Sequence, residues 1–386
     1  MDDEIVITEK QNNISKLLQQ ERSLVISIIS TFLLLLFGGT LMANLSNSFV
    51  FVFVFLWLFV VILLSAFAIV RHAESLAIIL GEPLGTLILT LSVIGVEVLM
   101  ISAVMLTGES NPTIARDTMF SVVMTLLGGM TGAALLLGGL RHHEQTYNLQ
   151  GANAYLALII PLAVLGLVLP NFTTTTAGPT LSPFQSIFTS LMSIGIYAIF
   201  LGVQTSRHRE YFISPGDITE IEHTGEDSQL HGEHEIKSTR HHALFLILYI
   251  LPLVFLAKEL AVPLEHATRV FGAPEVLSGF LVGVLILSPE AMSAVRAAVG
   301  NQLQRSVNIL LGSVLATIGL TIPAVLTIGL VTGKTIFLGL SSVNTILLLL
   351  LLALSTITFS KNRTNVLLGA VHLLLFFAYL MLMFES

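Results

Sequence analysis

Long apolar runs separated by short polar breaks dominate this chain. A run of about 20 apolar residues is the length that an α-helix needs to cross the ~30 Å hydrocarbon layer of a bilayer. We therefore predict an all-α, polytopic membrane protein with about eleven transmembrane helices. The predicted spans are residues 24–43, 49–70, 84–107, 118–139, 154–170, 184–204, 243–262, 275–296, 306–331, 336–358 and 365–384.

The composition sharpens this interpretation. Of the 386 residues, 54% are hydrophobic and only 11% are charged, and the mean hydropathy is +0.89, values far outside those of soluble globular proteins. The net charge of −7 argues against a nucleic-acid partner, and no feature indicates a protein partner. The absence of cysteine excludes disulfides, thiolate metal sites and cysteine nucleophiles.

The positive charges are distributed unevenly between the loops. If the N-terminus lies inside, 13 of the 17 Lys and Arg residues lie on the inner side, whereas only Arg116, Arg269 and Lys334 lie on the outer side. Cytoplasmic loops of membrane proteins carry such an excess. The polar first twenty residues lack the basic start and short apolar core of a cleavable signal. We therefore predict a multi-pass plasma-membrane protein with its N-terminus in the cytoplasm and its C-terminus outside.

One polar break is much longer than the others. Residues 207–242 contain six of the 11 histidines and many carboxylates, including the cluster His231-Gly-Glu-His-Glu235, and we interpret them as a solvated cytoplasmic linker. The linker separates a tail (1–23), a first half (24–206, the first helix plus five spans) and a second half (243–386, five spans). Glu97 and Glu290 occupy the third and eighth spans, which cross the membrane in opposite directions. This pattern predicts a ten-helix inverted repeat of five plus five helices with an added N-terminal helix.

The two glutamates are the strongest candidates for a functional site. Glu97 lies roughly 20 Å along its helix from Pro83, deep in the hydrocarbon layer, and Glu290 has a similar position in its own span. An ionised carboxylate at that depth is costly unless it faces a wet cavity or a cation. We predict that the two form one cation and proton site. The alternative is a pair of protonated carboxyls that only hold helices together.

Further oxygen ligands are expected beside each glutamate. Gly95 and Pro289 are expected to interrupt their helices and free backbone carbonyls. Ser92 and Ser288 add hydroxyls within about a turn, and Ser313 follows in the next span. Carboxylates, carbonyls and hydroxyls suit hard cations such as Ca²⁺, Na⁺ or K⁺.

The same carboxylates could couple the cation to protons. Burial disfavours the charged carboxylate and a bound cation favours it, so protons and cations compete for the same oxygens. This competition predicts cation/proton antiport with no cofactor beyond the transported Ca²⁺, Na⁺, K⁺ and H⁺. Glu82 and His372 are candidates for cation access or proton relay. An interfacial helix-start glutamate and a packing histidine are the alternatives.

Other function classes lack their residues. All five Asp, including Asp117, fall in predicted loops, no His-Glu-x-x-His is present and cysteine is absent, so an intramembrane aspartyl, metallo or thiol enzyme is not expected. A channel would need no midplane pair of titratable groups. The glycines of Gly128-Gly-Met-Thr-Gly132 and Gly138-Gly139 are interpreted as sites of close helix packing.

These residues resemble the calcium/cation antiporter superfamily, and within it the ChaA-type bacterial calcium (sodium/potassium)/proton antiporters. Gly81-Glu-Pro-Leu-Gly85 through Glu97 is similar to the family's Gly-Glu-x-Leu-Gly stretch and Gly-Asn-x-x-Glu motif. Leu285-Ile-Leu-Ser-Pro-Glu290 and Asn308-Ile-Leu-Leu-Gly-Ser313 resemble the second copy. The resemblance implies the inverted-repeat fold, a bacterial inner membrane and shared cation/proton carboxylates at Glu97 and Glu290.

The chain departs from the family motif at two positions. Ile94 and Leu287 stand where calcium/proton exchangers carry asparagine. Two side-chain oxygens are thereby missing from a cation that takes about six to eight. The expected function is export of Ca²⁺, and of Na⁺ and K⁺ as further substrates, against inward protons. The alternative is a monovalent-selective Na⁺(K⁺)/H⁺ antiporter.

Overall fold

The structure is a computed structural model that describes residues 19–81, 84–107, 112–214 and 237–385. Within these residues the chain forms eleven helical segments, ten of them long and apolar enough to cross a membrane, and the eleventh, α14, is 17 residues long. The segments are α2 (Arg22–Ala43), α3 (Ser48–Leu80), α4 (Leu84–Thr107), α5–η1–α6 (Ile114–His142), α7–η2–η3 (Leu149–Asn171), α8–η4 (Pro183–Arg207), α10 (Thr239–Phe271), α11 (Glu275–Val299), α12–η6–α13 (Leu303–Thr332), α14 (Ser342–Thr358) and α15 (Val366–Glu385). The predicted helical membrane fold is confirmed.

Local sequence signals explain where several helices begin and end. The Asn47 and Asn148 side chains accept hydrogen bonds from backbone N–H groups in the first turns of α3 and α7. Ser182 caps α8 in a reciprocal pair with Gln185. Such side chains satisfy N–H groups that lack a partner within the helix. At the other end, α10 stops at Gly272, whose φ of 65° favours glycine.

Several helices extend further than the apolar runs predicted. α3 continues to Leu80 rather than residue 70, so Arg71, His72 and Glu74 are helical. The hydropathy pattern ends the span before these polar residues, but the helix continues through them, and Arg71 pairs with Glu21 while His72 contacts His242 of α10. The prediction that Asp117 lies in a loop was wrong, because α5 begins at Ile114 and buries Asp117 in its first turn. Arg116 pairs with this carboxylate at 2.8 Å, which offsets the cost of burying it.

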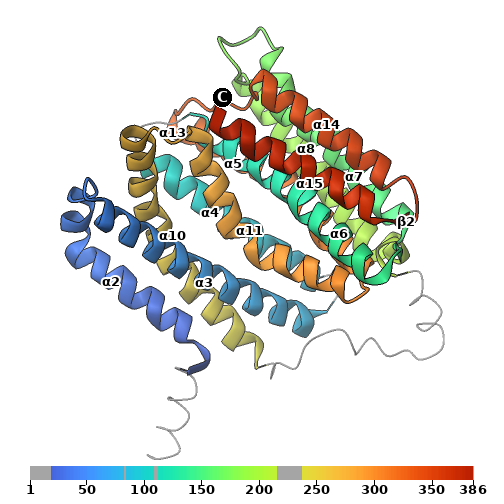
Figure 1. The fold of residues 1–386 in the computed structure, drawn as a ribbon, viewed down its shortest axis with the longest axis horizontal. Helices are drawn as coiled ribbons and strands as arrows, with labels where there is room; N and C mark the ends of the chain where they lie inside the picture. The colour runs from blue at the N-terminus through green and yellow to red at the C-terminus, as the bar shows by residue number, and fades with distance from the viewer. Residues whose placement is uncertain (1–18, 82–83, 108–111, 215–236, 386) are drawn as a thin grey trace, which may run out of the picture.

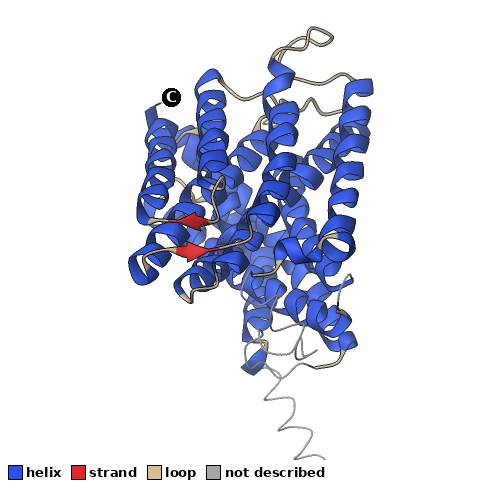
Figure 2. Cartoon of the chain, turned by 90° about the vertical axis from the view of Figure 1, so that its right-hand side faces the viewer, coloured by secondary structure: helices blue, strands red, loops and turns tan. Residues whose placement is uncertain are grey.

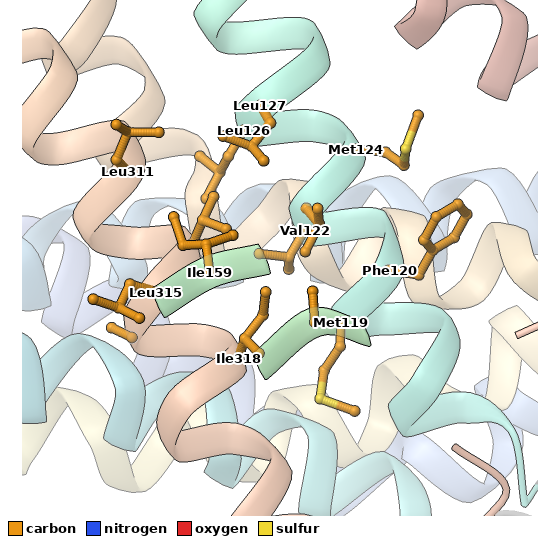
Figure 3. Packing of buried hydrophobic residues seen from close by; sticks show 14 of the residues in the cluster. Met119, Phe120, Val122, Met124, Leu126, Leu127, Ile159, Leu311, Leu315 and Ile318 are labelled. Atoms are coloured by element: carbon orange, nitrogen blue, oxygen red, sulfur yellow. The ribbon is translucent and has the colours of Figure 1, made fainter. Parts of the chain in front are cut away.

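The helices pack into two regions around α4 and α11 (Figure 1). The N-terminal layer consists of α2, α3 and α10, and its apolar side chains share a core with one face of α4 and α11. The main bundle consists of α5–α8 and α12–α15 and shares a second core with the other face of the same two helices. Figure 3 shows part of this second core, where Val122, Ile159 and Ile318 meet between α5, α7 and η6. The helices that carry Glu97 and Glu290 therefore lie between the two regions.

Two loops at one end of the bundle are joined by a short antiparallel pairing. β1 (Gln145–Thr146) pairs with β2 (Arg363–Thr364), with Gln145 opposite Thr364, as Figure 2 shows. This is the end at which α6 and α14 stop and α7 and α15 start. We call it the strand end, and it is the end that the sequence predicts to be cytoplasmic. The chain terminates at the opposite end (Figure 1).

The expected interruptions of the glutamate helices do not occur. α4 is continuous past Gly95, and α11 is continuous through Pro289. The helix that follows each of them has an irregular backbone instead, as do the α7 and α8 segments at η2 and η4. A π-helical segment, η1 (Met124–Met130), divides α5 from α6, and η6 (Thr317–Thr321) divides α12 from α13. π-helical turns of this kind occur frequently at functional sites.

Candidate functional site

Glu97 is the most enclosed carboxylate of the site. It lies on α4 with a relative exposure of 1%. The Thr317 hydroxyl donates to its Oε2 at 2.8 Å, and the Thr321 hydroxyl donates to its Oε1 at 3.1 Å. Both hydroxyls belong to η6, so the first half's glutamate is held by the second half's helix. A buried carboxylate needs such partners because it has lost its water.

Glu290 occupies the matching place on α11 and is half-buried. The Ser313 hydroxyl, one turn before Thr317, donates to Glu290 Oε2. Ser313, Thr317 and Thr321 follow one another at intervals of four residues and therefore share one face of their helix. We call these three residues the hydroxyl ladder. A single helical segment thus bonds both glutamates.

Glu97, Glu290 and a third carboxylate, Glu74, form a series of increasing exposure. Glu97 is within electrostatic reach of Glu290, and Glu290 is within electrostatic reach of Glu74 on α3. Their exposure rises in the same order, since Glu97 is buried, Glu290 half-buried and Glu74 exposed. Glu74 lies in the last turns of α3, at the strand end. The series therefore leads from the strand end towards the enclosed Glu97.

The remaining predicted ligands have varied surroundings. Ser313 joins the site, whereas the Ser288 hydroxyl donates to the Val284 carbonyl of its own helix at 2.5 Å. Ser92 is half-buried on α4. A Cβ at Gly95 would meet no atom within 4 Å, so this glycine is not there for close packing. Pro289 is buried within the continuous α11.

The two candidates for access or relay are not placed beside the glutamates. Glu82 lies outside the described residues. His372 is fully buried on α15, where its Nδ1–H donates to the Leu127 carbonyl at 2.6 Å and its Nε2 lies 2.9 Å from the Thr358 hydroxyl. These bonds satisfy both ring nitrogens of a neutral histidine. They support the interpretation of His372 as a packing residue, and a relay role stays a prediction.

The positions that depart from the family motif contribute packing instead of oxygens. Ile94 and Leu287 are 6% and 2% exposed and belong to the core of the main bundle. The oxygen side chains that hydrogen bonds join at the site are the two glutamates and the hydroxyl ladder. Among the described residues there is no group of three or more His, Asp or Glu side chains that could hold a metal ion.

Sequence reasoning missed four residues near the site. Thr317 and Thr321 could have been found from their four-residue spacing after Ser313. Glu74 was missed because the predicted span ended too early. Tyr197 of α8 lies behind η6, where its ring contacts Gly319; it hydrogen-bonds Thr90 and is within electrostatic reach of Glu290. A lone tyrosine in an apolar run gives no sequence signal.

The glycines predicted to permit close packing do so. A Cβ at Gly129 would lie 3.2 Å from the Phe376 ring, and one at Gly132 would lie 2.8 Å from Leu373. These glycines allow α15 to approach η1 and α6 closely. This packing fixes the backbone around Leu127, to which His372 is bonded.

Comparisons with known proteins agree with this architecture. The chain matches the model of the family described as "Sodium/calcium exchanger protein" over residues 50–206 and 241–385. It is 42% identical to the sodium-potassium/proton antiporter ChaA of Escherichia coli (strain K12) over 323 residues, which cover 84% of this chain and 86% of that protein. It is 24% identical to a Ca²⁺/H⁺ antiporter of Aphanothece halophytica over 268 residues, which cover 68% of this chain and 71% of that protein.

Solved structures show the same fold. The structure of native YfkE aligns with a TM-score of 0.72 at 20% identity, covering 94% of this chain and all of that one. The H⁺/Ca²⁺ exchanger CAX aligns with a TM-score of 0.60 at 16% identity, covering 91% of this chain and 88% of that one. The family match spans both halves of the chain and leaves out the linker between residues 206 and 241. The chain therefore belongs to the sodium/calcium exchanger protein family, whose members are membrane transporters and not enzymes.

Proposed function

We propose that this protein is a secondary cation/proton antiporter in which Glu97 and Glu290 carry the cation and the proton alternately. The observation that carries the proposal is the hydroxyl ladder, which bonds both glutamates from one helical segment. Two deep carboxylates bonded by hydroxyls of the same helical segment form a site that a cation can enter and a proton can neutralise. The ChaA relative, 42% identical, is named an antiporter of this class.

The hydroxyls give the site two bonding states. A serine or threonine hydroxyl can donate one hydrogen bond and accept at its lone pairs. In the structure the ladder donates to the carboxylates. When a cation enters, the same oxygens can turn their lone pairs towards it while the carboxylates supply the charge. Cation binding thus replaces the hydrogen bonds of the ladder with cation contacts. When the cation leaves, the glutamates take up protons and accept the hydroxyl hydrogen bonds again.

Glu74 is proposed as the access carboxylate on the strand end. It is exposed, it is within electrostatic reach of Glu290, and its helix packs against α11. A fixed negative charge at a pathway mouth raises the local concentration of cations. We further propose that the strand end faces the cytoplasm of a bacterial inner membrane, because the excess of Lys and Arg lies on that side.

The transported cations are proposed to be Ca²⁺, with Na⁺ and K⁺ as further substrates. The Ca²⁺/H⁺ antiporter relative and the CAX fold support Ca²⁺. A specific observation favours the alternative of a monovalent-selective antiporter. Ile94 and Leu287 fill the core where the family motif has asparagine, so Ca²⁺ would find fewer of the roughly six to eight oxygens that it takes.

Proton flux in everted membrane vesicles tests the proposal. Ca²⁺, Na⁺ or K⁺ is added to vesicles energised with a proton gradient, and a pH-sensitive dye reports proton release. Wild type is compared with Glu97→Gln and Glu290→Gln, each inserted to equal levels, and with Glu259→Gln on α10 as a control glutamate. We expect release in wild type and the control and none in the two site variants.

The result also decides the cation. Release by Na⁺ or K⁺ that micromolar Ca²⁺ does not inhibit would establish the monovalent-selective alternative. Exchange at the wild-type rate in either site variant would mean that the glutamate is structural, and the shared-carboxylate mechanism would then be wrong.

A further inference from the structure

A second buried polar cluster lies at the strand end of the N-terminal layer, away from the glutamate site. It joins Glu21 just before α2, Arg71 and His72 on α3, and His242 on α10. Glu21 is 6% exposed, His72 1% and His242 6%. The proposed antiport does not use these groups. Their burial at the junction of three helices calls for a separate explanation.

The centre of the cluster is a direct contact between two imidazole rings. His72 Nδ1 and His242 Nδ1 are 3.0 Å apart. His242 Nε2 accepts a hydrogen bond from the backbone N–H of Lys237 at 3.2 Å. His72 Nε2 lies 3.3 Å from Glu21 Oε2. The two rings therefore connect the chain leading into α10 with the start of α2.

These contacts fix one arrangement of protons for neutral rings. Because His242 Nε2 accepts from Lys237, the proton of neutral His242 is on Nδ1. That Nδ1–H donates to His72 Nδ1, so the proton of neutral His72 is on Nε2, which lies 3.3 Å from both Glu21 Oε2 and Arg71 Nη2. Its N–H donates to Glu21, and Arg71 donates to Glu21 as well instead of to the ring. Each bond in the series determines the next. The opposite tautomers would leave His242 without a proton.

One added proton cannot be accommodated without losing a bond. If His72 takes the proton on Nδ1, two N–H groups face each other 3.0 Å apart unless His242 moves its own proton to Nε2. If His242 moves its proton to Nε2, or takes the added proton there, its Nε2–H faces the backbone N–H of Lys237. Either the contact between the rings or the bond to Lys237 is lost.

Fixed charges surround the two rings. Burial alone would raise the pKa of Glu21, but the hydrogen bonds with His72 and Tyr249 and the charge of Arg71 hold it below its usual value. Glu21 is thus a fixed anion that also accepts from the Arg71 guanidinium at 2.6 Å and from the Tyr249 hydroxyl at 3.0 Å. The ionisable and charged groups around the two rings are Glu21 before α2, Arg71 on α3, His241 and Tyr249 on α10, and Lys237 before α10, whose ammonium bonds Gln20.

We propose that the His72–His242 pair is a proton-binding site distinct from the transport site, and that protonation releases the first turn of α10 from α3. At alkaline and neutral pH the two neutral rings hold Lys237 and α10 against α3. As the pH falls, the added proton breaks this connection at the junction between the linker and the second half. Because α3 and α10 both pack against α4, the state of the pair can set the transport rate according to cytoplasmic pH. This last step rests on the proposed function; the proton site itself does not.

The backbone amide of Lys237 is a direct reporter of the pair. Hydrogen–deuterium exchange of a peptide covering residues 237–242 is measured in the purified full-length protein between pH 8 and pH 5.5 and corrected for the intrinsic exchange rate. We expect protection to fall about tenfold or more at the acidic end, since the bond that protects the amide is lost. His241→Gln, which leaves the paired rings in place, serves as the control and should behave as wild type. Protection that does not change with pH would overturn the proposal.

Transport kinetics test the consequence. Initial rates of cation-driven proton flux at saturating cation are measured against the pH on the strand-end side for wild type, His241→Gln, His242→Gln and His72→Gln. We expect the transport rate to change stepwise with pH in wild type and His241→Gln, and this step to be absent from His242→Gln and His72→Gln. If the step persists in an inserted and active pair variant, the pair does not control transport. If Glu97→Gln does not transport but still shows pH-dependent hydrogen–deuterium exchange at the Lys237 amide, the proton site is supported independently of the proposed transport function.

Discussion

The helices that directly follow the two glutamate helices carry the same backbone feature but bond different partners. α5–η1–α6 and α12–η6–α13 each contain a π-helical segment near the middle. In the first, the Leu127 carbonyl accepts from His372, and Ser121 bonds the Tyr379 hydroxyl at 2.6 Å. In the second, the hydroxyls of Thr317 and Thr321 point to Glu97. The first anchors α15, and the second bonds Glu97.

The difference lies in what covers each segment. Glycines 128, 129 and 132 let α15 lie directly on the first helix. In the second helix, η6 packs against α4, α5, α7 and α8, and its threonines donate to the Glu97 carboxylate of α4. An irregular turn therefore does not by itself make a site. The partner helix decides whether the freed polar groups serve packing or ion binding.

The largest expected effect on transport comes from the two threonines of η6. Replacing Thr317 and Thr321 together with Val should raise the cation KM by about 100-fold, because a hydrogen bond to a charged group contributes about 1.5–3 kcal/mol and each 1.4 kcal/mol is tenfold. Thr131→Val in the first helix is the matched control, since its hydroxyl bonds only the Leu126 carbonyl. Vesicle flux at a series of cation concentrations measures both. Equal KM values would show that the ladder does not contact the cation.

A smaller effect is expected from restoring a motif oxygen. Leu287→Asn should increase Ca²⁺ transport relative to Na⁺ by about tenfold, because one added oxygen ligand favours the cation with the larger coordination number. Leu285→Asn, also fully buried on α11, controls for the cost of a buried amide. The ratio of Ca²⁺-driven to Na⁺-driven proton flux is the measurement. A ratio that rises equally in both variants contradicts the assignment.

Glu74, the proposed access carboxylate, should have a moderate effect on the cation KM. Glu74→Gln should raise the cation KM about threefold at low salt with Vmax unchanged, and the effect should shrink at high salt because exposed charges are screened. Glu74→Asp should restore most of the affinity. Glu144→Gln is the control, because Glu144 is exposed at the strand end and paired with Arg363. A fall in Vmax instead of a rise in KM would indicate a structural role.

The smallest effect on transport is expected at His372. His372→Gln should leave flux within about twofold of wild type, yet lower stability by about 1–3 kcal/mol, because the Leu127 carbonyl or the Thr358 hydroxyl loses its partner in a buried place. Thermal unfolding in detergent and vesicle flux measure the two quantities. Loss of proton-coupled flux with unchanged stability would identify a relay and remove the contrast between the two helices.

Much of the fold followed from the apolar pattern. Spans near 24–43, 84–107, 184–204 and 365–384 were found within a few residues, because a bilayer imposes a length on its helices. The pattern erred where polar residues continue a helix at its end, as at Arg71 and Glu74 on α3 and Asp117 on α5. Arg71 pairs with Glu21 from before α2, and Asp117 pairs with Arg116 and accepts from Thr113 at the start of its own helix. A hydropathy pattern does not show such partners.

The sequence by itself determined that two glutamates lie deep in antiparallel spans, because hydropathy and the number of crossings depend only on residue order. The sequence also identified Ser313 as a candidate ligand. Only the tertiary structure decided that Thr317 and Thr321 bond Glu97 across the two halves, that Glu290 is the more accessible carboxylate, and that His72 meets His242. These contacts join residues far apart in the chain, and their geometry depends on how helices pack.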